Sequence, residues 1–347
     1  MPDVIDLSKY TGSGATAAVP VLTLEQLREQ AKNVSWLVKH AVPAESLGVM
    51  FGASGTFKSF IALDLALHVA HGMRWMGRKT RKGPVLIVAA EGGAGLWRRI
   101  VAWHREHGLK WTDVPVYVVP VSVDLGSDAA TVVEAAKALG VAPALVVVDT
   151  LSQTFSGEEN SATDVGAYLR ELGVWFRAAW QAAVLVVHHT GHEATERPRG
   201  SSALRANVDF MFGVFRDQKE MLATMECVKQ KDGELFPPAS FALTVKEVAK
   251  DEDGDAVTTL VARQLASGQE TLALMSHEAS RGRGGRNQLL LEMAFNGIEE
   301  KTLRMNFCKA IDGDAETKRQ AYHRAKRWAQ NAGLIEVAEG YVIRYGA

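Results

Sequence analysis

Continuous apolar runs alternate with amphipathic segments from residue 47 to residue 191. The apolar runs predict buried strands at 47–52, 83–93, 114–121, 143–150 and 182–191. Segments with helical spacing lie between them at 59–72, 96–108, 128–140 and 165–180. Buried strands that alternate with helices are typical of a parallel sheet covered by helices on both faces.

The pattern differs on either side of this region. Residues 1–20 are small, polar and turn-forming, which predicts a disordered arm. Residues 22–38 carry apolar positions at helical spacing, with Thr23 as a candidate N-cap. From about residue 208 the apolar runs are shorter and are joined by turn signals such as Asp232-Gly233, which predicts antiparallel strands. We expect these strands at 209–217, 220–234, 239–249 and 256–264.

The last part of the chain predicts a small separate domain. Residues 281–286 read as a flexible basic linker. Helical segments at 287–297, 300–311 and 314–333, followed by a hairpin, are the order that a winged helix requires. The predicted fold is therefore α/β, with a mostly parallel sheet and an antiparallel extension over 21–280, then a winged helix over 287–347.

The charge distribution adds one point to this picture. The 347 residues carry a formal net charge of −1, which gives no sign of nucleic-acid binding. Residues 281–347, however, hold 12 Lys and Arg against 8 Asp and Glu, so this end is basic and the rest of the chain is acidic. In the helix at 314–333 the candidate contacts to duplex DNA are Lys318, Arg319, Tyr322, His323, Lys326 and Arg327. A solvated helix face, or recruitment of a replication protein, explains the same charges.

Composition also bears on location. No apolar stretch reaches the roughly 18 residues that a membrane span needs. The N-terminus has early acidic residues and no apolar core, unlike a secretory signal. Cys227 and Cys308 have no spacing typical of a disulfide framework or a zinc site. We expect a cytoplasmic protein that does not associate with membranes.

The segment that follows the first predicted strand resembles a phosphate-binding loop, G-x-x-x-x-G-K-[ST]. Its glycines allow the backbone to curl around phosphates, its lysine supplies charge and its serine a hydroxyl for Mg²⁺. Phe57 stands where the second glycine is expected, and is tolerable if its backbone is near-helical and its ring points away from the nucleotide. The predicted nucleotide-binding residues are Gly52, Ala53, Ser54, Gly55, Thr56, Phe57, Lys58, Ser59 and Phe60.

Polar side chains end three of the predicted strands. Asp149 is a candidate Mg²⁺ ligand together with Ser59, or caps a strand end. Glu91 is a candidate general base that orients the attacking water. His188 and His189 alternate along one strand, so we expect one to face the core and the other to sense the γ-phosphate. Zinc binding by this pair with His192 is less favoured, because no cysteine or acidic cluster completes the ligands.

Two basic segments follow. Residues 192–200 contain Arg197 and Arg199, suited to single-stranded DNA phosphates or to a neighbouring subunit's nucleotide, unless they form a solvated loop. Lys229 and Lys231 lie two residues apart on a strand, so both point to one face and are able to reach one phosphate group. Exposed lysines at a turn are the alternative.

The order of these motifs resembles RepA-like hexameric helicases of the RecA-like P-loop ATPase group, which act in plasmid and phage or prophage replication. The resemblance spans about residues 36–250 and rests on the phosphate-binding loop and on "AAEG", "VVVDT", "VVHHTG", "RGSSAL" and "VKQKDGE". It implies a RecA-like core, ATP and Mg²⁺ as cofactors, and a homo-oligomeric ring, expected to be a hexamer, that translocates on single-stranded DNA. A phenylalanine in the loop would then be a subfamily trait.

The resemblance also implies a role for each site residue. Lys58 and Ser59 match the phosphate lysine and the Mg²⁺ hydroxyl. Asp149 matches the Walker B aspartate, which holds Mg²⁺. Glu91 matches the catalytic glutamate, and His189 the position that senses the γ-phosphate.

The resemblance implies several candidate residues at the subunit interface. Arg199 belongs to the interface segment "RGSSAL", and Lys229 and Lys231 match a pair that related helicases use across the interface. Arg205 is a further candidate. Asp209 departs from the plasmid helicase pattern, which has its trans-acting arginine near this position, so the identity of that residue stays open. An ATPase that loads or remodels without unwinding, or a nucleotide-gated DNA-binding regulator, is the alternative function.

Overall fold

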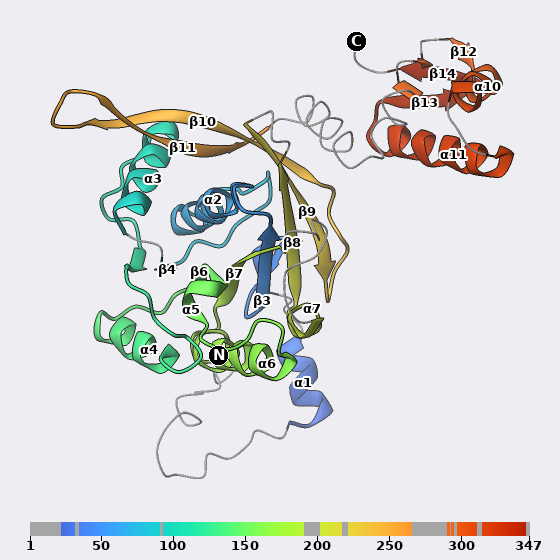
Figure 1. Ribbon diagram of the computed structural model, residues 1–347. Helices are drawn as coiled ribbons and strands as arrows, with labels where there is room; N and C mark the ends of the chain where they lie inside the picture. The colour runs from blue at the N-terminus through green and yellow to red at the C-terminus, as the bar shows by residue number, and fades with distance from the viewer. Residues whose placement is uncertain are drawn as a thin grey trace. The chain divides into compact units, whose positions relative to one another are not determined.

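The computed structural model describes most of the chain, and Figure 1 shows its helices and strands. The described residues are 22–31, 35–90, 93–190, 202–216, 221–265, 290–291, 293–294, 297–310 and 314–344. The chain divides into two compact units. The first holds Met1–Phe215, Met225–Pro238 and Leu243–Arg263, and the second holds Arg216–Thr224, Ala239–Ala242 and Gln264–Ala347.

Most of a nine-stranded sheet lies in the first unit. Its order is β11-β10-β9-β8-β3-β7-β6-β4-β5, and the pairs from β8 through β3, β7, β6 and β4 to β5 are parallel. The parallel strands are β3 (Leu47–Gly52), β4 (Val85–Ala89), β5 (Val116–Val119), β6 (Leu145–Asp149), β7 (Ala183–His189) and β8 (Phe210–Arg216). The extension consists of β9 (Leu222–Gln230), β10 (Ala239–Lys250) and β11 (Ala256–Gln264). The mostly parallel sheet of the sequence prediction is confirmed.

Helices cover both faces of this sheet (Figure 1). On one face lie α2 (Lys58–His71) and α3 (Gly93–Glu106). On the other lie α4 (Ala129–Ala138), α6 (Ala162–Leu172) and the π-helix η2 (Gly173–Ala178), whose apolar side chains share one core with β3, β4, β6 and β7. Two short helices, α5 (Leu151–Thr154) and α7 (Ser202–Asn207), follow β6 and precede β8. Because both faces are covered, the central strands are apolar along their whole length.

The direction of β8 differs from the prediction. The sequence pattern predicted an antiparallel strand at 209–217, but β8 is parallel to β3, with Gly48 opposite Phe210. The chain between β7 and β8 is long enough to return to the other end of the sheet, which a parallel pair requires. Five residues separate β8 from β9, and five separate β10 from β11. A connection of this length is too short for such a return, so the two strands of each pair are antiparallel.

The predicted helix at 22–38 is too long. Helix α1 covers Leu24–Ala31, with Thr23 as its N-cap: the Thr23 hydroxyl accepts the Gln26 amide at 3.2 Å. Residues Trp36–Val38 instead form β1, which pairs with β2 (Val42–Pro43). Leu37 is fully buried, and its carbonyl accepts the Arg81 amide at 2.8 Å. These contacts with distant residues override the local helical spacing.

The C-terminal part of the second unit has its own core. Helices α10 (Glu300–Ala310) and α11 (Ala315–Asn331) pack against a three-stranded sheet of order β12-β14-β13. Its strands are β12 (Ile298–Glu299), β13 (Ile335–Ala338) and β14 (Tyr341–Arg344). The helix expected at 287–297 lies largely outside the described residues. The assignment of this part as a winged helix therefore stays a prediction.

None of the helices in the described ranges is long and apolar enough to cross a membrane.

Candidate functional site

The candidate phosphate-binding loop joins β3 to α2 at one edge of the sheet. Gly55 has a φ of +77°, a conformation that favours glycine. A Cβ at Gly52 would lie 2.2 Å from the carbonyl oxygen of Val214, so the close approach of β8 excludes any larger residue. Lys58 is buried, and its Nζ donates to the Ala53 carbonyl at 2.7 Å, which closes the loop on itself. The loop therefore has the curled backbone and the lysine that phosphate binding requires.

The backbone of Phe57 is left-handed, with φ +69° and ψ +18°. This corrects the expectation of a near-helical backbone: the turn from β3 into α2 requires the positive φ that a glycine would supply without strain. The side chain offsets part of this cost, because only 9% of Phe57 is exposed and its ring meets the edge of Phe60 at a centroid distance of 6.2 Å. Phe57 is thus a strained backbone position held by an anchored ring.

Phe57→Gly is expected to retain most ATP turnover, because the backbone and not the ring would surround the phosphates. Phe57→Ala is the matched control, since it removes the same ring but keeps a Cβ at positive φ. We expect the glycine variant to be more stable than the alanine variant by about 1 kcal/mol in urea unfolding. Equal stability of the two variants would contradict the left-handed backbone, and loss of nucleotide binding in Phe57→Gly would contradict the assigned role of the loop.

Asp149 and Ser59 meet next to this loop. Asp149 ends β6, Ser59 lies in the first turn of α2, and the Ser59 hydroxyl donates to the Asp149 carboxylate at 3.0 Å. A carboxylate beside a hydroxyl is the set of oxygen ligands that Mg²⁺ uses beside nucleotide phosphates. The two residues therefore fit the predicted Mg²⁺ site.

The two histidines of β7 separate as strand alternation predicts. His188 is 2% exposed. His189 is less buried, lies opposite Gly52 in the register of β3 and β7, and places its Nδ1 3.4 Å from the Lys58 Nζ. His189 is thus the member of the pair that lies beside Lys58 of the loop.

The comparison with known families agrees with this geometry. Residues 15–195, just over half of the chain, match the family described as the AAA domain. The chain belongs to the AAA domain family. This membership supports a P-loop ATPase that binds a nucleotide, typically with Mg²⁺. No curated protein matches the chain.

Several predicted residues of this AAA domain protein lie outside the described residues: Glu91, His192, Arg197 and Arg199. The chain on both sides of Glu91 is described. Before it, the Ala90 amide donates to the Asp149 carbonyl at 3.2 Å, and after it α3 begins at Gly93. The ends of the segment that contains Glu91 therefore lie beside Asp149 and at the start of α3.

Lys229 and Lys231 lie far from the phosphate-binding loop. Strand β9 is antiparallel to β8, so its end lies at the edge of the sheet where β3 begins, opposite the loop. There the Lys229 Nζ donates to the carbonyl of Arg205 at 2.7 Å, near the end of α7. Lys231 forms an ion pair with Asp209 at 3.5 Å. These lysines therefore cannot reach the phosphate-binding loop of the same chain.

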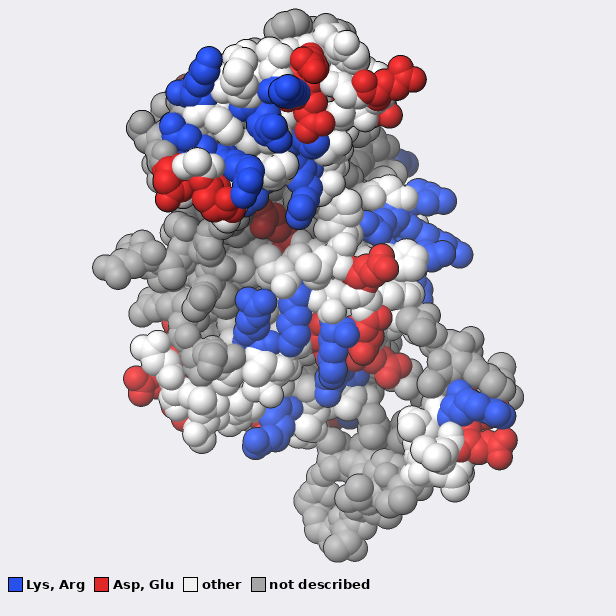
Figure 2. All heavy atoms as spheres, turned by 90° about the vertical axis from the view of Figure 1, so that its right-hand side faces the viewer, with Lys and Arg blue, Asp and Glu red and all other residues white. Residues whose placement is uncertain are grey.

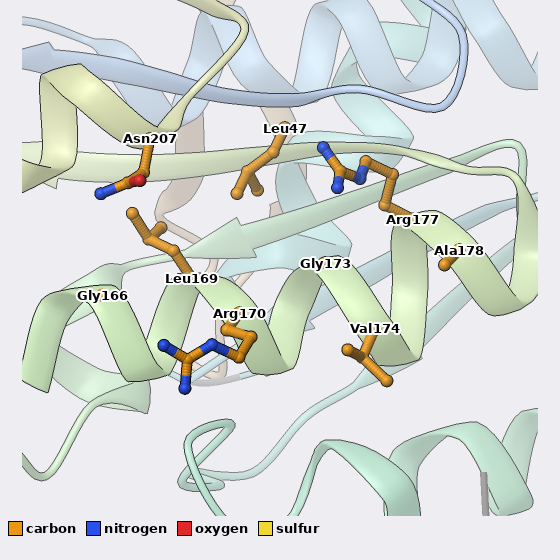
Figure 3. A pocket seen from close by; sticks show the side chains of 9 residues that line it. All are labelled: Leu47, Gly166, Leu169, Arg170, Gly173, Val174, Arg177, Ala178 and Asn207. Carbon is orange, nitrogen blue, oxygen red and sulfur yellow. The ribbon is translucent and has the colours of Figure 1, made fainter. Parts of the chain in front are cut away.

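Asp209 has a structural role that the sequence did not reveal. Its carboxylate accepts the Leu47 amide at 2.9 Å, at the start of β3, and lies 3.4 Å from Arg177 and 3.5 Å from Lys231. A pocket of about 460 Å³ opens beside this cluster (Figure 3). It is lined by Leu47, Gly166, Leu169, Arg170, Gly173, Val174, Arg177, Ala178 and Asn207. Since Leu47 starts β3, this pocket is not the nucleotide site.

The candidate DNA contacts of α11 differ in their exposure, and Lys318 is half-buried. Tyr322 is fully buried and packs against Phe307 in the core, so its expected contact with DNA is wrong. Lys326 is engaged in an ion pair with Glu300. His323 and Arg327 are exposed, as is Arg319, which pairs with Glu316 on the same helix. The tyrosine lies on the apolar stripe of the helix, and His323 and Arg327 lie on the opposite face.

Proposed function

We propose that this protein is an ATP-hydrolysing, ring-forming DNA helicase of the RepA-like type, which translocates on single-stranded DNA in plasmid or phage replication. The observation that carries the proposal is the meeting of Lys58, Ser59 and Asp149 at the carboxyl edge of a parallel sheet. Ligand sites of open parallel sheets lie at this edge.

The proposed chemistry is attack of water on the γ-phosphate, which yields ADP and phosphate. Lys58 and the amides at the start of α2 stabilise negative charge on the phosphate oxygens. Glu91 accepts the proton of the attacking water. Mg²⁺, when bound by Ser59 and Asp149, neutralises charge on the β- and γ-phosphates. His189 contacts the γ-phosphate and changes partner when that group leaves.

Assembly into a ring would complete each site. Lys229 and Lys231 lie at the edge of the sheet opposite their own loop, a placement that suits contact with a neighbouring subunit's nucleotide. In a closed ring, two different surfaces of each subunit meet its two neighbours, so residues far from a subunit's own loop are able to reach the loop of the next subunit. We propose a hexamer in which these lysines act in trans, with Arg199 and Arg205 as further interface residues.

The C-terminal unit would act as a targeting module. Lys and Arg side chains gather on its surface (Figure 2), and α11 exposes Arg319, Arg324 and Arg327. If this unit is a winged helix, α11 is its third helix and would enter the major groove of duplex DNA. A replication protein is the second candidate partner, because α11 also exposes acidic residues such as Glu316, which pairs with Arg319.

ATP hydrolysis measured with and without DNA tests the proposed function. Single-stranded DNA is expected to stimulate hydrolysis strongly and duplex DNA weakly, and the stimulation is expected to fall steeply with salt because the grip is electrostatic. Hydrolysis that is indifferent to DNA would contradict translocation and favour a loader or remodeller. Duplex binding without appreciable turnover would favour a nucleotide-gated regulator.

A further inference from the structure

Three of the side-chain contacts between α2 and α3 lie at equal spacing, the last of them at His107, directly after α3. The Arg99 guanidinium lies 4.5 Å above the ring of Phe60. One turn further on, the Trp103 Nε1 donates to the Asp64 carboxylate at 2.8 Å. One turn beyond that, the rings of His107 and His68 meet edge to face at 5.5 Å. Positions four residues apart share a face of a helix, so these three contacts form one continuous seam between parallel helices.

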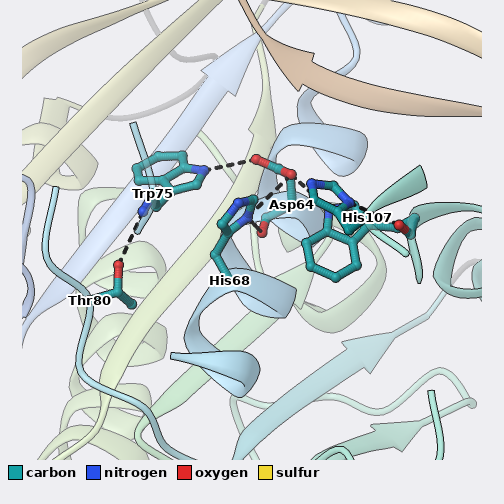
Figure 4. Close-up of polar contacts among 6 residues, drawn as sticks. Asp64, His68, Trp75, Thr80 and His107 are labelled. Atoms are coloured by element: carbon teal, nitrogen blue, oxygen red, sulfur yellow. Dashed lines mark hydrogen bonds and ion pairs between the residues drawn. The ribbon is translucent and has the colours of Figure 1, made fainter. Parts of the chain in front are cut away.

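Asp64 is the centre of this seam (Figure 4). It is 3% exposed, and a buried carboxylate is costly unless donors surround it. Its oxygens accept the Trp103 Nε1 at 2.8 Å and the Trp75 Nε1 at 2.9 Å, and His68 Nδ1 lies 3.3 Å away. Burial lowers the pKa of His68, but its hydrogen bond to Asp64 and the charge of Asp64 outweigh burial and raise it. The Asp64 carboxylate thus favours the charged form of the His68 imidazole.

A metal centre is the competing interpretation of this cluster. Ligand atoms of Asp64, His68 and His107 lie within 4.8 Å of one another. However, each oxygen of Asp64 already accepts an indole N–H. His68 Nδ1 lies 2.7 Å from the Asp64 carbonyl, and His107 Nδ1 lies 2.9 Å from the Trp103 carbonyl. These contacts favour a hydrogen-bonded structural centre over a metal site.

We propose that the bond between Asp64 and Trp103 fixes α3 on α2, and thereby sets the position of the start of α3 relative to the phosphate-binding loop. The loop opens α2, the helix that carries Asp64, and α3 begins two residues after Glu91. Because β4 is hydrogen-bonded along its length to β5 and β6, the chain before Glu91 is fixed by the sheet. The chain after Glu91 is fixed by the seam. Trp103 and Asp64 are therefore positioning residues for hydrolysis, a role that rests on the proposed function.

The test compares two variants that each remove one indole donor from the same carboxylate. Trp103→Phe removes the central hydrogen bond between α2 and α3, whereas Trp75→Phe removes the donor that follows α2 and leaves the bond between the two helices in place. Both are expected to lower the melting temperature by a similar few degrees. Only Trp103→Phe is expected to lower kcat, by about 10- to 100-fold, with KM for ATP little changed. Amide hydrogen exchange in 93–106 is expected to accelerate in Trp103→Phe alone.

The results separate a positioning role of Trp103 from a merely structural role and from a metal centre. Equal kcat values and equal exchange in the two variants would overturn the proposal, since a merely structural carboxylate predicts no difference. If the wild-type protein lacks Lys58-dependent hydrolysis, the proposed function fails, and faster exchange of α3 in Trp103→Phe alone still supports the seam. Stoichiometric binding of Co²⁺ or Zn²⁺ that raises the melting temperature, and that His107→Ala abolishes, would show a metal centre and overturn the hydrogen-bonded one.

Discussion

Lys58→Ala is expected to lower ATP hydrolysis by at least about 10²–10³-fold. Lys58 is the one cation of the described loop. It is buried at the N-terminus of α2, where its Nζ donates to the Ala53 carbonyl. A bound nucleotide would replace that carbonyl contact with phosphate oxygens, so the charge acts where negative charge develops. Hydrolysis is measured by phosphate release and nucleotide affinity by a fluorescent ATP analogue.

The control for this variant is Lys110→Ala, which removes an exposed lysine from the same domain. It is expected to leave both hydrolysis and affinity unchanged. Thermal melting without nucleotide separates a loss of folding from a loss of chemistry, because Lys58→Ala also removes the bond to Ala53. Turnover within a few-fold of wild type in a folded Lys58→Ala protein would refute the site.

Combined replacement of Lys229 and Lys231 by alanine is expected to lower hydrolysis by about 10³-fold or more if the lysines act in trans. They lie at the edge of the sheet opposite the loop, so the loss would not come from the same subunit. Mixing this variant with Lys58→Ala is then expected to restore activity. In a mixed ring, some interfaces combine an intact loop with intact lysines from the neighbour.

If Lys229 and Lys231 only stabilise the fold, the mixing experiment is expected to give a different result. Lys229 also binds carbonyls near the end of α7, so the double variant loses some stability, which thermal melting measures. Lys250→Ala, an exposed lysine at the end of β10, serves as the matched control. If the mixture hydrolyses no more ATP than the sum of its components, the lysines do not complete a neighbour's site.

The central sheet and part of the site follow from short stretches of sequence. Each parallel strand is a continuous apolar run, and the contact between Ser59 and Asp149 follows once both runs end at the same edge of the sheet. The loop motif required only local spacing. These predictions hold because each strand, and the loop, is determined by residues that lie close together in the sequence.

What the sequence did not reveal depends on distant partners. The direction of β8 depends on how the chain returns across the sheet, and Asp209 caps a strand whose first residue lies 162 positions earlier. The positive φ of Phe57 arises from the turn that the fold imposes, against the preference of the residue. The seam between α2 and α3 needs the relative rotation of two helices, which no local pattern contains.

The crowding at Gly52 bears on how relatives of this chain should be interpreted. This glycine is the first residue of the phosphate-binding motif, yet what excludes a side chain there is the backbone of β8 at Val214. A descendant that had lost ATP hydrolysis would still need glycine at this position in order to fold, while Lys58 would be free to drift. A glycine at position 52 in a relative therefore indicates that the sheet packing is kept. Lys58 and the Asp149–Ser59 pair are the residues that indicate whether the relative still binds nucleotide.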